Sequence, residues 1–84
     1  MSTADAVEKL VESIRPLLAG RSPHTQSAAL ADLLAIWLAS HIIHGNPAAT
    51  DKLREELLEA HIEAVRRLIP INSRQIHGDP RRFS

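Results

Sequence analysis

The chain has 84 residues with balanced charge, five histidines and no cysteine. A formal net charge of +0 excludes strong attraction of the whole molecule to nucleic acid or anionic lipid, because such attraction requires an excess of positive charge. The absence of cysteine excludes disulfides and thiolate metal sites. Hydrophobic residues make up 44% of the chain and aromatic residues only 2%, which predicts a core built from aliphatic side chains.

The first predicted helix begins after Ser2, which is a candidate N-cap with Asp5 three residues later. Pro16 predicts a kink or a break, because its ring removes an N–H and clashes with the preceding turn. Gly20 then ends the segment. The apolar residues recur at three- and four-residue spacing, typical of an amphipathic helix: Val7, Leu10, Val11, Ile14, Leu17 and Leu18.

Two further helix starts are predicted from the same sequence pattern. Ser22-Pro23 and Asn46-Pro47 each place a favoured N-cap residue before a proline, which suits the first helical position. They predict a helix over residues 23–44 and another over residues 47–69, the latter starting at Pro47 or after Thr50. Turn-forming residues then predict that residues 1–70 form a helical domain and that residues 71–84 form a mobile tail, with a short turn or brief helix before it.

The predicted helix over residues 23–44 is apolar on nearly every side, which is typical of a buried helix. Each neighbouring helix covers roughly a third of the circumference, so two neighbours leave part of it uncovered. We therefore expect a homodimer. The predicted fold class is all-α, with an N-terminal helix plus a helix hairpin in each chain, assembled into a dimeric helical bundle. A loosely packed monomer and a complex with another protein are the alternatives.

The candidate interface residues lie on the apolar sides of the two hairpin helices. Trp37, the only aromatic residue of the helical body, is the first choice for an interface anchor, and a simple core role is the alternative. The full set is Leu30, Leu34, Trp37, His41, Leu58, His61, Ile62 and Val65.

A buried polar pair is also predicted. Residues equally far from the Gly45-Asn46-Pro47 turn face each other in a hairpin, which brings Asp32 to the level of His61. Because a buried carboxylate must be paired or neutralised, we predict an Asp32–His61 pair, within one chain or across the dimer. The alternative is an Asp32 side chain in solvent at the edge of the helix.

No catalytic or cofactor site is predicted. His41 and His44 are three residues apart, but two imidazoles are too few for a tight metal site. The sequence contains no motif that combines a nucleophile with a base and no phosphate-binding glycine pattern. We therefore expect no enzymatic activity, no metal and no cofactor.

The alternative function is association with nucleic acid through the basic residues Arg74, Arg81 and Arg82. A helix-turn-helix is disfavoured, because the first turns of its recognition helix would carry acidic residues that repel phosphates. Only a non-specific contact through the tail is consistent with the charges.

The apolar run over residues 28–43 is too short for a transmembrane helix, and polar residues interrupt it. The first residues do not resemble a secretory signal. We expect a cytoplasmic protein that does not associate with membranes. Its expected function is protein–protein interaction or regulation as a homodimer, with a protein partner that the sequence does not identify.

Overall fold

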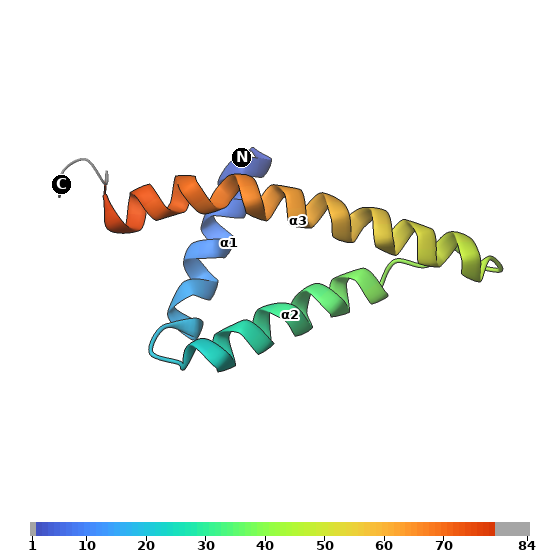
Figure 1. Cartoon of the computed structure of the whole chain (residues 1–84), viewed down its shortest axis with the longest axis horizontal. Coiled ribbons are helices and arrows are strands. Elements are labelled where there is room, and N and C mark those ends of the chain that lie inside the picture. The colour runs from blue at the N-terminus through green and yellow to red at the C-terminus, as the bar shows by residue number, and fades with distance from the viewer. Residues whose placement is uncertain (1, 79–84) are drawn as a thin grey trace. The chain divides into compact units, whose positions relative to one another are not determined.

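The computed structural model describes residues 2–78, which form three helices and no strand (Figure 1). These are α1 (Thr3–Leu18), α2 (Pro23–Ala39) and α3 (Pro47–His77). The predicted all-α class is confirmed. The chain divides into two compact units, Met1–Ala35 and Ile36–Ser84, so α1 and most of α2 belong to the first unit and α3 to the second.

All three helices begin where the sequence predicts, because each N-cap side chain accepts a hydrogen bond from a backbone N–H of the first turn. Ser2 Oγ accepts from the N–H of Asp5 at 3.1 Å. Ser22 Oγ accepts from Thr25 at 3.1 Å, and Asn46 Oδ1 accepts from Ala49 at 3.0 Å.

α1 continues through Pro16 and ends at Leu18. Of the kink or break predicted at Pro16, the break is therefore wrong, because the ring removes one backbone hydrogen bond while the next turn still closes. The N–H of Ala19 donates to the Arg15 carbonyl at 3.0 Å. Gly20 then takes a φ of 78°, a left-handed conformation that glycine adopts without a steric penalty.

α2 ends at Ala39, not at His44 as predicted from its apolar run. Local side chains compete for the carbonyls of its last turn: Ser40 Oγ donates to the Trp37 carbonyl at 2.6 Å, and Nδ1 of His41 lies 2.8 Å from the same oxygen. The next residues include Ile42 and Ile43, whose β-branched side chains disfavour a helix. Residues 40–46 form the connection to α3 instead.

α3 extends to His77, so the predicted end at Ile69 is also wrong. Pro70 lies inside the helix, where proline costs about 3 kcal/mol. The helical residues on both sides of it offset that cost. The helix ends at Gly78, whose N–H donates to the Arg74 carbonyl at 2.8 Å. Residues 71–77 of the predicted tail are thus helical, whereas its residues 79–84 lie outside the described range.

The hydrophobic side chains of the described residues are all at least partly exposed, and none is buried. Thr50 is the only buried residue of the described range, with 6% of its surface exposed. The aliphatic core expected from the composition is therefore not formed within the described part of the single chain.

Candidate interaction site

The second unit is held together by side chains of α3 that close the end of α2. Nε of Arg54 donates to the His41 carbonyl at 3.1 Å, and Nη2 donates to the Ala39 carbonyl at 2.8 Å. The helix itself leaves the Ala39 carbonyl without a partner, and the His41 carbonyl lies just beyond the helix. A charged donor makes both bonds stronger than neutral ones. Arg54 therefore fixes the point at which α2 ends.

Thr50 completes this junction from the first turn of α3. Its hydroxyl accepts from the N–H of Ile43 at 2.9 Å. The same oxygen lies 3.2 Å from the Ile43 carbonyl and 3.1 Å from the Asn46 carbonyl, either of which can accept its proton. One buried hydroxyl thus ties the connecting segment to the start of α3.

Replacing Thr50 by valine is expected to lower the free energy of unfolding by about 1–3 kcal/mol, because the part-buried Ile43 N–H then loses its acceptor. Urea denaturation followed by circular dichroism measures this loss. Thr3→Val is the matched control, since Thr3 is exposed, and its effect should stay near 0.5 kcal/mol or below. Equal losses in the two variants would contradict a structural role for the Thr50 hydroxyl.

Trp37 lies at the centre of a small aromatic cluster in the same unit. Its ring centroid is 4.5 Å from that of His41, in an edge-on arrangement, and 4.7 Å from that of His61. Nδ1 of His61 lies 3.0 Å from the Leu57 carbonyl. Because a carbonyl only accepts, both histidines donate through Nδ1, which fixes the orientation of each ring against the indole.

Three of the predicted interface residues are thus brought together, and they fit the hairpin register expected around Gly45. Leu58 and Ile62 are half-buried on α3 in the same unit, whereas Val65 is 53% exposed. Leu30 and Leu34 lie on α2 in the first unit, where Leu30 is exposed and Leu34 half-buried. The role of all these residues in an interface stays a prediction.

The Asp32–His61 pair also stays a prediction, because the two residues belong to different units. Asp32 is exposed on α2, as in the alternative interpretation. His41 and His44 both follow the end of α2, so they do not share the helical spacing assumed in the sequence interpretation. The described residues contain no group of three or more potential metal ligands.

Sequence reasoning missed the apolar surface on the second half of α3, because the helix was expected to end at Ile69. Leu68, Ile69, Ile71 and Ile76 are all exposed there. A shallow, mainly apolar hollow follows the helix from Val65 to His77. The available signal was the apolar spacing, which continues beyond Pro70.

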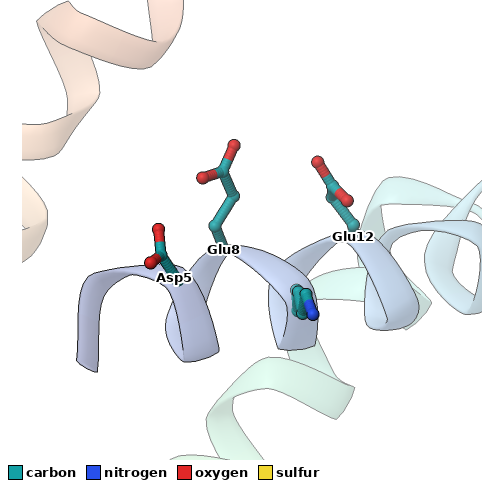
Figure 2. Close-up of a pocket in the computed structure, with 4 residues that line it drawn as sticks. Asp5, Glu8 and Glu12 are labelled. Carbon is teal, nitrogen blue, oxygen red and sulfur yellow. The ribbon is translucent and has the colours of Figure 1, made fainter. Parts of the chain in front are cut away.

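The charged surfaces carry no comparable site. Figure 2 shows the carboxylates of Asp5, Glu8 and Glu12 pointing to the same side of α1, where they line a shallow depression with Lys9. All four residues are exposed, which is typical of the solvated face of an amphipathic helix. This depression is therefore a charged, exposed face of α1.

The residues considered for nucleic-acid contact are only partly described. Arg74 lies in the last turn of α3 and is exposed, while Arg81 and Arg82 lie outside the described residues. Another shallow depression on α3 is lined by one acidic and two basic residues, Glu63, Arg66 and Arg67.

Comparison with protein-family models, curated proteins and solved structures gives no match for this chain. Within residues 2–78, no helix combines the length and the apolar character needed to cross a membrane. The candidate site therefore has to be interpreted from its own chemistry, which is that of exposed aliphatic side chains on a framework of capped helices.

Proposed function

We propose that this chain is a small interaction or regulatory protein that acts as a homodimer and has no catalytic activity of its own. The observation that supports the proposal is the exposure of fifteen large hydrophobic side chains among the described residues, with none buried. Isolated exposed hydrophobic residues are normal, but large contiguous patches mark interaction surfaces. Here such side chains occur on all three helices.

The available area is sufficient for a second copy. Fifteen aliphatic or aromatic side chains at about half exposure offer on the order of 1,000 Å² of apolar surface per chain, whereas a specific interface needs roughly 800 Å² per partner. Burying apolar surface contributes about 25 cal/mol per Å². A homodimer is the simplest assembly that buries part of this surface, since each copy supplies the other with the same apolar residues.

The test is the mass in solution, measured by light scattering after size exclusion over a hundredfold range of concentration. We expect about twice the chain mass of 9.3 kDa. A mass of 9.3 kDa at every concentration, together with cooperative unfolding, would overturn the proposal. The chain would then bury its apolar surface within itself.

A dimer of this kind would act by presenting a composite surface to a further protein. Trp37 is 40% exposed although both imidazoles pack against it. A rigid, partly exposed indole is a suitable anchor for such a partner, because aromatic anchors contribute strongly to protein interfaces.

A further inference from the structure

A seven-residue repeat runs along α3 from Leu58 to Ile76. Isoleucine recurs every seventh residue at positions 62, 69 and 76, and the residues four positions before them are Leu58, Val65 and Asn72. On a continuous helix, alternating spacings of four and three form one stripe, equivalent to the a and d positions of a coiled coil. This stripe is named the heptad seam and consists of Leu58, Ile62, Val65, Ile69, Asn72 and Ile76.

The second half of the heptad seam has no cover within its own unit. Val65 is 53% exposed, Ile69 59% and Ile76 65%. The apolar hollow between Val65 and His77 is lined by residues of α3 alone. Spaces of this kind between seam residues are the holes that receive side chains from a facing helix in a coiled coil.

We infer that the heptad seam is where α3 pairs with α3 of a second copy, in parallel and in register, with Asn72 of one copy facing Asn72 of the other. The inference rests on the proposed homodimer and specifies its contact.

The composition of the heptad seam supports two strands. Isoleucine at every a position is typical of parallel two-stranded coiled coils, and the d positions carry Leu58, Val65 and Asn72. In register, each apolar residue meets its own kind, and the only polar layer pairs Asn72 with itself. A carboxamide both donates and accepts hydrogen bonds, so two copies of Asn72 satisfy each other.

Antiparallel pairing gives poorer matches. If the two seams overlap completely, Asn72 lies opposite Ile62 and Arg66 lies beside Arg66 of the second copy. Shifting the pairing by one heptad removes this repulsion but places Ile76 opposite Asp51. An unpaired polar or charged group against an apolar side chain is unfavourable. In the parallel pair every layer from Leu58 to Ile76 matches, and the contact ends at Leu58 because the next positions of the stripe, Glu55 and Asp51, would face their own like charges.

Pro70 is compatible with this seam. At 100° per residue it lies roughly 130° from the centre of the stripe, so its ring does not occupy the contact. In a parallel pair the two prolines also stand at the same level, and any bend in one helix is repeated in the other.

Cysteine cross-linking tests the inference cleanly, because the chain has no cysteine of its own. Ile76→Cys places a thiol in the seam, and Arg74→Cys places one on the opposite side of the same turn. A disulfide requires Cα atoms about 4.4–6.8 Å apart, which a parallel, in-register pair provides at position 76. Under mild oxidation we expect nearly complete covalent dimer for Ile76→Cys and little for Arg74→Cys.

The outcomes distinguish pairing through the heptad seam from dimerisation through another surface. Equal cross-linking of the two variants, or none in either, overturns the seam even if light scattering of the reduced proteins still gives a dimer. A monomeric mass for the unmodified chain overturns the proposed function as well. Asn72→Leu provides a second measurement: replacing the polar layer should tighten dimerisation about tenfold or more, whereas an unchanged dissociation constant would show that Asn72 faces solvent.

Discussion

Replacing Ile69 by aspartate is expected to convert the dimer into a monomer. Each dimer loses the burial of two isoleucine side chains that are 59% exposed in the single chain, worth about 2–4 kcal/mol together, and gains two carboxylates that must be desolvated. The lost burial alone weakens association by roughly one to three orders of magnitude. Light scattering at micromolar concentration should then give the chain mass of 9.3 kDa.

Ile71→Asp is the matched control for this variant. Ile71 has nearly the same exposure as Ile69, 49% against 59%, and it receives the same substitution on the same helix. It lies outside the heptad seam, so the Ile71→Asp variant should remain dimeric. Dissociation of both variants to the same extent would contradict an interface centred on the seam.

Removing the indole in Trp37→Ala should destabilise the second unit by about 2–3 kcal/mol. Truncation of a fully buried tryptophan costs about 3–5 kcal/mol, and the smaller value reflects the 40% exposure of Trp37. The loss arises from the contacts with His41 and His61, which join the end of α2 to α3. Urea denaturation followed by circular dichroism at fixed protein concentration measures the change.

Leu33→Ala serves as the comparison, because Leu33 lies on the same helix and is 55% exposed. Its truncation should cost clearly less than that of Trp37. If the two losses are equal, the indole contributes only general apolar surface, and packing against the imidazoles adds nothing to stability.

The starts of all three helices and the end of α1 before Gly20 could be predicted, whereas the ends of α2 and α3 could not, for a physical reason. An N-cap depends only on nearby residues, because the side chain of Ser22 or Asn46 accepts a hydrogen bond from a backbone N–H three residues later. The end of α2 depends on Arg54, which lies fifteen residues after Ala39. No pattern within α2 itself contains that information.

The site was predictable to a similar degree. The sequence predicts Trp37 as the only aromatic residue of the helical body, His61 from hairpin register and Ile62 from apolar spacing, and their roles in an interface stay predictions. The capping roles of Thr50 and Arg54 depend on the path of residues 40–46, which follows from the early end of α2. The continuation of α3 through Pro70 was not predicted, because proline usually ends a helix. That rule considers the free-energy cost of one residue and not the summed stability of all residues in the helix.

The closure of α2 by Arg54 and Thr50 also bears on the order of folding. The hydrogen bonds of this junction join residues only seven to fifteen positions apart, and such short-range contacts form within microseconds to milliseconds. A unit built from them can form on one chain before a second chain arrives. The slow, concentration-dependent step of folding would then be the encounter of two preformed hairpins.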